Sequence, residues 1–542
     1  MIRVCCHGLV KSGRTTVNTP LGPLQGFEEA DGVRSWQGVP FARPPSANLR
    51  FRPPQPLTDK WTEPKDCTKP GSMCPQLDIH KNVYLGNEDC LYLNIWVPPS
   101  ASVGSPADVM LWIYGGAFEI GDGSEFGTYD GRSLASNTSK VVVTFNYRVG
   151  IFGFFPHVAL LSESEHNTTG NYGLQDQRAA MQWVTENIAL FGGNPNKVTL
   201  FGESAGAMSV CYHLASPASA GLFARAIMES GNCDSAELFK PWRAAEASGN
   251  RVAQDLGCDL GDDHAGTLKC LRGLTTGELQ ADAWFPGKNA TADSFATLAP
   301  ICTYVPTIDG SPIGMLEAPL ETFKRGEGNK VPVIMGSNRD EGTIFVPLLP
   351  FVVERHSIHF PLNDQGVQYF VERIMHYNTT TSARVLAQYP SDHFKTEDSR
   401  AAAILRDYVI LCPTRRALRA MVGSGMRDVW EYRFTYPMHW AGSGILGDYH
   451  GSEVFFVFRS ALKQSLTHRV NAKDRQMVDI FTSYWSSFAS VGNPNNSTRR
   501  LPSWPRYTSM SDLHQELTVP PTPKRGLKSV LCDFWDNVQK SL

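Results

Sequence analysis

The sequence has no long apolar run, no excess of charge of one sign and no metal-binding pattern. No apolar stretch in its 542 residues reaches the about 18 residues of a spanning helix, so we expect no transmembrane segment. Fifty basic and 53 acidic residues give a net charge of -3, too balanced for a nucleic-acid-binding protein. H-E-x-x-H and paired C-x-x-C patterns are absent, so we expect no metal and no other cofactor. A small molecule is therefore the expected partner, and nothing in the sequence indicates an oligomeric state.

A convincing signal peptide is also missing. Residues 1–16 place Arg3 and Lys11 around a run that is too short and too polar for one, and we treat them as an N-terminal extension of unclear role. Six Asn-x-Ser/Thr triplets nevertheless indicate secretory glycosylation, although such triplets also occur by chance in cytosolic proteins. They begin at Asn137, Asn167, Asn289, Asn378, Asn495 and Asn496.

The order of the expected elements predicts an α/β fold. Strand-like apolar runs cover 91–97, 108–114, 140–147, 198–203, 225–228, 331–336 and 429–435, and helical periodicity covers 173–190, 205–214 and 477–489. Alternating strands and helices imply a mostly parallel sheet with helices on both faces. Frequent Pro and Gly in 17–60 predict short strands and turns there, at 17–22, 41–45 and 49–54. Since repeats and low-complexity tracts are absent, we expect a single domain over 17–536.

Ser204 lies at the centre of the most informative motif, Gly-Glu-Ser-Ala-Gly at 202–206. A serine between two glycines, after a strand and before a helix, is typical of a nucleophile elbow. The two glycines would let strand and helix pass each other, and the serine would face a substrate. The alternative interpretation is an ordinary glycine-flanked connection.

A nucleophilic serine needs a base and a carboxylate that orients that base. His450 is the best base candidate because glycines at 447 and 451 indicate a loop, whereas His213, His393 and His439 are interpreted as surface or packing residues. Three acids stay eligible on physical grounds: Asp340, Glu341 and Asp448. The alternative for the first two is a solvated turn. Small residues at 115–117 could direct backbone N–H groups at an oxyanion, together with the N–H of Ala205.

Several longer motifs in the same order resemble the type-B carboxylesterase/lipase family, which includes the cholinesterases. They lie at 88–94, 114–117, 145–148, 170–178 and 202–206, and the likeness extends from about residue 17 to 535. The resemblance implies an α/β-hydrolase fold with a large, mixed, mostly parallel central sheet. It carries the acid onto Glu341, the base onto His450, and the oxyanion donors onto Gly116, Ala117 and Ala205. Ala117 stands where glycine is commoner, and its methyl is expected to narrow the space beside the acyl carbon.

The same resemblance implies residues that support the site. Glu203, Ser230 and Glu453 match buried polar groups behind the triad. Arg50 with Glu88 and Arg148 with Asp176 match internal ion pairs, although surface pairs in these places would contribute only about 0 to 1 kcal/mol.

The family positions also imply three disulfides: Cys74–Cys90, Cys258–Cys270 and Cys412–Cys532. The remaining cysteines are expected to be thiols, with intermolecular bonds as an alternative for the first two: Cys5, Cys6, Cys67, Cys211, Cys233 and Cys302. Cys302 aligns near the acyl pocket, but a buried structural thiol is the preferred interpretation. Disulfides together with glycosylation triplets indicate an oxidising compartment, so we expect a secreted or secretory-pathway protein whose signal peptide is absent from this N-terminus.

The expected activity is hydrolysis of carboxylic esters by a Ser-His-Glu triad through an acyl-enzyme. Cholinesterases bind a quaternary ammonium on a tryptophan before the 88–94 motif. Residues 67–90 contain no tryptophan, and Ile344 stands where cholinesterases have an aromatic residue, so acetylcholinesterase activity is not expected. Two alternatives stay open. One is a lipase of the same family, although 74–90 is too short for a long lid; the other is a catalytically inactive adhesion or binding protein.

Overall fold

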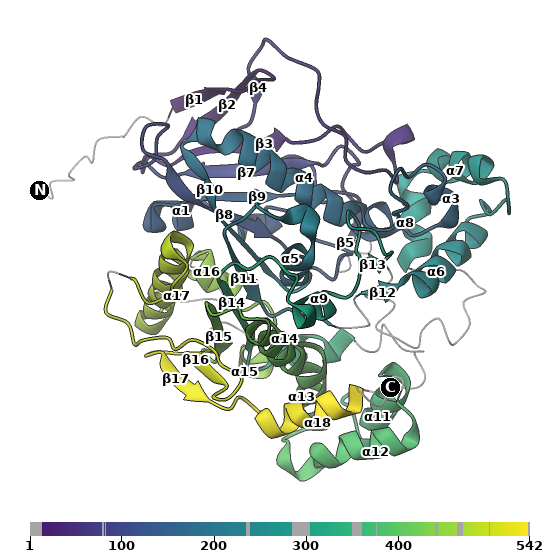
Figure 1. Ribbon diagram of the computed structural model, residues 1–542, viewed down its shortest axis with the longest axis vertical. Helices are drawn as coiled ribbons and strands as arrows, with labels where there is room; N and C mark the ends of the chain where they lie inside the picture. Colours follow the sequence, from purple (N-terminus) through teal and green to yellow (C-terminus); the bar gives the residue numbers. More distant parts are fainter. Residues whose placement is uncertain are drawn as a thin grey trace, which may run out of the picture.

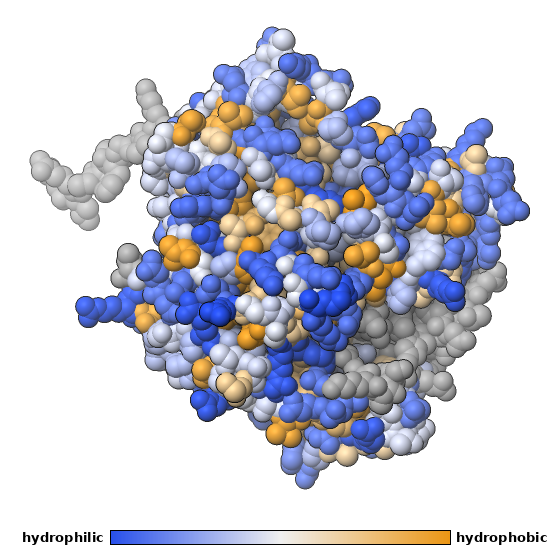
Figure 2. Space-filling view, in the orientation of Figure 1, coloured by the Kyte–Doolittle hydropathy of each residue, from blue (hydrophilic) through white to orange (hydrophobic). Residues whose placement is uncertain are grey.

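The computed structural model describes residues 13–78, 81, 83–234, 239–284, 304–348, 360–375, 377–438, 443–462, 470–497 and 499–539. Cys5, Cys6, Asn289, Cys302 and His439 lie outside the described residues. Within the described ranges no helix is both long and apolar enough to span a bilayer. On the face shown in Figure 2, apolar residues form small separate patches among polar ones.

One sheet of 13 strands runs through the molecule (Figure 1), in the order β1-β2-β3-β7-β9-β8-β10-β11-β14-β15-β16-β17, with β4 beside β2. Its strands are β1 Gly13–Asn18, β2 Pro23–Glu28, β3 Arg34–Pro40, β4 Lys65–Asp66, β7 Tyr92–Val97, β8 Ala107–Ile113, β9 Val141–Phe145, β10 Gly193–Glu203, β11 Arg225–Glu229, β14 Val333–Asn338, β15 Val429–Phe434, β16 Leu513–Leu517 and β17 Thr522–Arg525. From β9 to β16 all neighbours are parallel, whereas both ends of the sheet are antiparallel. The mixed, mostly parallel sheet is as expected.

Helices cover both faces of this sheet (Figure 1). Helices α4, α5 and α14 pack on one face, and α1, α16 and α17 on the other. The helices are α1 Arg132–Thr138, α2 Gly150–Phe154, α3 Val158–Leu161, α4 Tyr172–Asn187, α5 Ala205–Ala215, α6 Trp242–Asp255, α7 His264–Gly273, α8 Thr276–Trp284, α9 Pro319–Arg325, α11 Asp364–Tyr369, α12 Thr379–Gln388, α13 Glu397–Leu405, α14 Cys412–Gly423, α15 Ser443–Leu446, α16 Val454–Val457, α17 Ala472–Val491 and α18 Ser529–Gln539. Two small sheets stand apart, β5 Gln76–Asp78 with β6 Val83–Leu85 and β12 Lys240–Pro241 with β13 Thr307–Ile308.

The composition of the central strands explains their position. β9 reads Val-Val-Val-Thr-Phe and is buried along its whole length, and β8 is buried from Val109 to Ile113. Strands that helices cover on both faces are apolar without alternation. The elbow strand β10 lies between β8 and β11 and is therefore in the middle of the sheet.

The N-terminal part differs from expectation in two respects. Residues 13–16, which we assigned to the extension, begin β1. Of the short segments expected there, only 17–18 falls in a strand, while 41–45 and 49–54 form connections around a 3₁₀ turn at Ala47–Leu49. Prolines in both connections remove the N–H groups that a strand would pair.

The ion pairs at Arg50 and Arg148 are buried. Arg50 donates from Nε and Nη2 to the two carboxylate oxygens of Glu88, each at 2.7 Å. Arg148 binds Asp176 in the same two-pronged way, and neither side chain is more than 2% exposed. They are therefore not the solvated surface pairs of the alternative interpretation.

Four disulfides occur among the described residues. They include the pairs Cys74–Cys90, Cys258–Cys270 and Cys412–Cys532. The fourth joins Cys211 to Cys233, which we expected to be thiols, so that expectation is wrong. Cys211 lies on α5 and Cys233 follows β11, and α5 packs on β11, which brings the two sulfur atoms together. Cys67 is a buried thiol.

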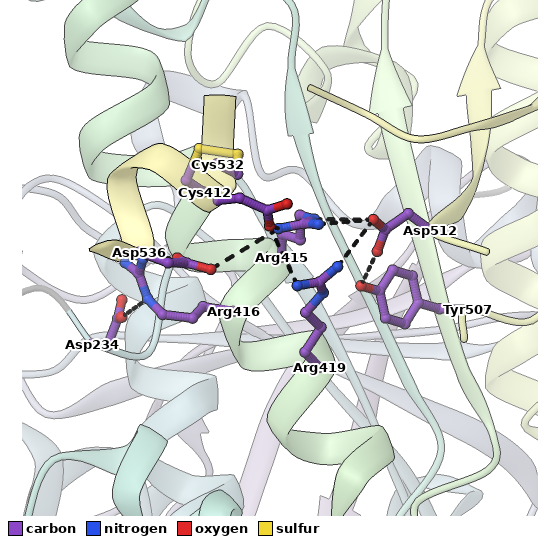
Figure 3. A network of polar contacts seen from close by, with 10 residues as sticks. Asp234, Cys412, Arg415, Arg416, Arg419, Tyr507, Asp512, Cys532 and Asp536 are labelled. Carbon is purple, nitrogen blue, oxygen red and sulfur yellow. Dashed lines mark hydrogen bonds and ion pairs between the residues drawn. A yellow bond between two sulfur atoms is a disulfide. The ribbon is translucent and has the colours of Figure 1, made fainter. Parts of the chain in front are cut away.

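A polar network joins the C-terminal helix α18 to α14 (Figure 3). Arg415, 3% exposed, donates to Asp512 at 3.0 Å and to Asp533 at 2.8 Å, while Asp512 also accepts from Tyr507 at 2.6 Å. These contacts hold the pKa of Asp512 below its usual range, although burial alone raises it. The disulfide Cys412–Cys532 links the same two helices.

Replacement of Arg415 by Met should destabilise the protein by about 3 to 5 kcal/mol, because the buried carboxylate of Asp512 then loses its main partner. The depressed pKa of Asp512 gives stability above the pKa of the unfolded chain, and this is lost as the pH falls. The difference in Tm between wild type and variant should therefore shrink in acid. Lys324→Met removes an exposed pair with Glu321 and is the control, with an expected effect of about 1 kcal/mol or less. Equal Tm values for both variants at pH 7 would contradict the prediction.

Peptide mapping without reduction should find the peptides of Cys211 and Cys233 joined, and alkylation after unfolding should label Cys67. The measurement is mass spectrometry of a digest made at acidic pH, which suppresses exchange of disulfides. Recovery of Cys211 and Cys233 as alkylated thiols would restore the original expectation.

Candidate active site

Ser204 lies in the sharp turn between β10 and α5. Its backbone has φ 56° and ψ -125°, a strained conformation for a residue with a side chain, and its N–H donates to the carbonyl of Glu229 at 2.9 Å. A Cβ on Gly206 would lie 2.0 Å from the carbonyl oxygen of Ile113, and one on Gly202 would lie 2.7 Å from the backbone of residue 206. Both glycines are thus required by close backbone contacts.

His450 contacts one of the three acids that the sequence left open. Its Nδ1 lies 2.7 Å from Oε2 of Glu341, which is fully buried, and Oε1 of Glu341 accepts from the backbone N–H of Asn338 at 2.6 Å. Asp340 and Asp448 bind Arg339 instead, at 3.1 and 2.8 Å. The carboxylate of Glu341 accepts a hydrogen bond from Nδ1–H of His450. The neutral imidazole therefore has its proton on Nδ1, and Nε2 is the basic atom.

A second carboxylate approaches the other ring nitrogen. Oε1 of Glu203 lies 3.2 Å from Nε2 of His450. Behind it, Ser230 donates from Oγ to Oε1 of Glu453 at 2.7 Å, and Asn338 donates to the other oxygen of Glu453. All these side chains are buried, so the imidazole has carboxylates on both sides in a dry environment.

These surroundings set the charge of His450. Burial alone lowers its pKa, but the negative charges of Glu203 and Glu341 outweigh burial and raise the pKa to about 9. Burial raises the pKa of Glu203 to about 8, with repulsion from Glu453 and Glu341 adding to the effect. The imidazolium is therefore stabilised relative to that of a free histidine, and His450 must lose this proton before it can act as a base.

The segment after β8 passes directly beside the elbow. A Cβ on Gly115 would lie 2.8 Å from Cβ of Ser204, so only glycine permits this approach. Gly116, Ala117 and Phe118 all have positive φ, at 108°, 57° and 63°. The chain therefore makes a sharp turn here, and turns of this kind can direct backbone N–H groups at an anion.

Ser204, Glu341 and His450 line one cavity that is partly open to solvent, and the empty space in and before it is about 670 Å³. Ala117, Ala205 and Ser230 also line it. The other walls are Gly342, the charged Arg406 and several apolar side chains: Met208, Phe345, Leu405, Val409 and Ile410. The expected triad residues are thus gathered around one mainly apolar chamber, whereas Glu203 and Glu453 do not line it but contact His450 and Ser230.

The sequence reasoning did not single out Asn338 and Met208. Asn338 ends β14, three residues before Glu341, and its side chain links Glu453 to the carbonyl of Tyr449 at 2.9 Å. Its place shortly after the expected strand 331–336 and three residues before Glu341 was the available signal. Met208 lies one helical turn after Ser204, a spacing that places it on the same face of α5.

A model of the carboxylesterase family matches residues 13–535. Acylcarnitine hydrolase of Mus musculus is 32% identical over 96% of this chain and 90% of its own. Acetylcholinesterase 1 of Caenorhabditis elegans is 32% identical over 92% of this chain and 83% of its own, and acetylcholinesterase of Bungarus fasciatus is 33% identical over 97% and 87%.

Solved structures of PNB esterases are similar in fold. One has a TM-score of 0.77 at 30% identity and covers 96% of this chain and 99% of its own. A thermophilic PNB esterase has a TM-score of 0.78, also at 30% identity, over 96% and 99% of the two chains. The fold is therefore the α/β-hydrolase fold.

Replacement of Glu203 by Gln should lower the pKa of His450, because it removes a negative charge 3.2 Å from Nε2. A histidine below its pKa is protonated and cannot accept a proton, so the acidic limb of Ser204 reactivity should move to lower pH. The measurement is the rate of inactivation by phenylmethylsulfonyl fluoride against pH. Glu321→Gln, an exposed and distant change, should leave the profile in place. A limb that moves to higher pH in the Glu203 variant would contradict the electrostatic explanation.

Proposed function

Because the chain belongs to the carboxylesterase family, it is a carboxylic ester hydrolase, and we propose that it works through Ser204, His450 and Glu341 by way of an acyl-enzyme. The observation that carries the proposal is the position of His450, with Glu341 on Nδ1 and the wall of the Ser204 cavity on its other side. No other described histidine lines that cavity.

In the first step, Oγ of Ser204 attacks the ester carbonyl and its proton passes to Nε2 of His450. Glu341 holds the imidazole in the required tautomer and stabilises its charged form. The N–H groups of Gly116, Ala117 and Ala205 bind the oxyanion, and loss of one such donor typically costs about a hundred- to a thousandfold in turnover. His450 then gives its proton to the leaving alcohol.

In the second step, His450 takes a proton from water, which attacks the acyl-enzyme, and Ser204 recovers its own proton as the acid leaves. Glu203 adds negative charge beside Nε2 and favours the imidazolium in both steps. Ser230 and the side chain of Asn338 donate to Glu453, and the backbone N–H of Asn338 donates to Glu341.

The substrate that fits best is an ester with an apolar acyl group. The chamber beside Ser204 is lined mainly by aliphatic side chains and Phe345, together with Arg406. Residues 67–90 include no tryptophan, and the exposed Tyr84 on β6 is the largest aromatic side chain there, so a choline ester is not the proposed substrate. Between Cys74 and Cys90 the described residues form a two-stranded hairpin, which favours an esterase over a lipase with a long lid.

We also propose that the protein matures in the secretory pathway. Four disulfides suit an oxidising compartment. The glycosylation triplets at Asn137, Asn167 and Asn378 begin at exposed residues. Asn495 and Asn496 are exposed as well. Nδ2 of Asn495 donates to the carbonyl of Trp504, and Nδ2 of Asn137 likewise donates to the carbonyl of Ser133.

Replacement of Ser204 by Ala should abolish hydrolysis of p-nitrophenyl esters, with a loss in kcat/KM of at least about a thousandfold. The measurement is release of p-nitrophenol for acyl chains from acetate to palmitate. A preference for acetate to hexanoate is expected of an esterase, whereas a maximum at long chains would identify a lipase. If wild type and variant were equally inactive, the chain would instead be an inactive binding protein; equal turnover by both would reject Ser204 as the nucleophile.

A further inference from the structure

One wall of the cavity is a π-helical turn. The turn η10, Arg406–Leu411, joins α13 to α14, and Leu405, Val409 and Ile410 line the cavity. π-helical turns inside α-helices are rare and occur mostly at functional sites. The π-helical turn therefore lines the same cavity as Ser204.

Pro413 explains the irregularity. It stands near the start of α14 and has no N–H, so the carbonyl of Val409, four residues earlier, cannot receive the usual helical hydrogen bond. The proline ring would also clash with that carbonyl in a regular helix. A widened turn relieves the clash, but the carbonyl of Val409, which is partly buried, still needs a donor.

Asn232 supplies that donor from outside the helix. Its Nδ2 lies 2.6 Å from the carbonyl oxygen of Val409. Asn232 is fully buried and follows β11, the strand next to the elbow strand. The segment around it is held in place, since Cys233 is bonded to Cys211 and Thr414 donates to the carbonyl of Gly231 at 3.1 Å. The wall of the cavity is thus attached to a segment after β11 that a disulfide and a hydrogen bond hold in place.

We propose that Asn232 is a positioning residue that sets the acyl-chain length accepted by the enzyme, because it holds Val409 in the cavity wall. The inference rests on the proposed ester hydrolysis. The acyl chain is the part of the ester concerned, because it stays bonded to Ser204 after the alcohol has left and so occupies the chamber through both steps. An Asn232 amide that fixes the wall keeps the chamber narrow and favours short chains.

The test compares kcat/KM for p-nitrophenyl hexanoate with that for p-nitrophenyl acetate in the purified full-length enzyme. Asn232→Ala and Asn232→Leu both remove the donor, and Leu keeps most of the volume. The hexanoate-to-acetate ratio should rise about three- to tenfold, as expected for loss of one hydrogen bond to a partly buried carbonyl. Val409→Ala should raise the ratio in the same direction, and this holds even if the Asn232 variants fold poorly.

Asn329→Ala is the matched control. Asn329 also donates from its amide to backbone carbonyls, those of His213 and Ser216 at 2.9 and 3.0 Å, but it does not line the cavity. This variant should lower Tm and leave the ratio unchanged. An unchanged ratio in the Asn232 variants or in Val409→Ala, or an equal change in Asn329→Ala, would overturn the inference. If Ser204→Ala kept the activity of the wild type, the proposed function itself would fail, so the two failures are distinguishable.

Discussion

The close contact between the backbone at Gly206 and the carbonyl of Ile113 constrains the positions of the neighbouring site residues. A side chain at 206 would lie 2.0 Å from that oxygen, so the start of α5 can approach β8 only where a hydrogen atom replaces Cβ. This approach turns the chain sharply enough to hold Ser204 at φ 56°. The same closeness brings Gly115 against Ser204.

The other site residues come from the order of the strands. Glu341 follows β14 and His450 follows β15, and both strands run parallel to β10 in the middle of the sheet. Since the carboxyl ends of parallel strands meet at one edge, residues more than a hundred positions apart can converge there. Glu203 ends β10 itself, which explains why it reaches His450 from the side opposite to Glu341.

Much of this could be predicted from the sequence, because the central strands and the elbow have strong local signals. The choice among Asp340, Glu341 and Asp448 could not be made on physical grounds, since the sequence does not tell in which direction each carboxylate points. The pairing of Cys211 with Cys233 was also missed, because it depends on the packing of α5 against β11. Asn232 gave no signal either, since its partner is a backbone carbonyl whose own donor is lost through Pro413.

The disulfides differ widely in the length of chain that they enclose. Cys211 and Cys233 are 22 residues apart, whereas Cys412 and Cys532 are 120 residues apart. Cys532 lies in helix α18. During synthesis on the ribosome, the first three bridges can close once Cys270 has emerged. The Cys412–Cys532 bridge can close only after Cys532 has emerged as well, 262 residues later (532 − 270). The disulfides can therefore form in a fixed order during synthesis. Cys211–Cys233, on the helix that follows Ser204, can form before Cys412–Cys532, which attaches α18.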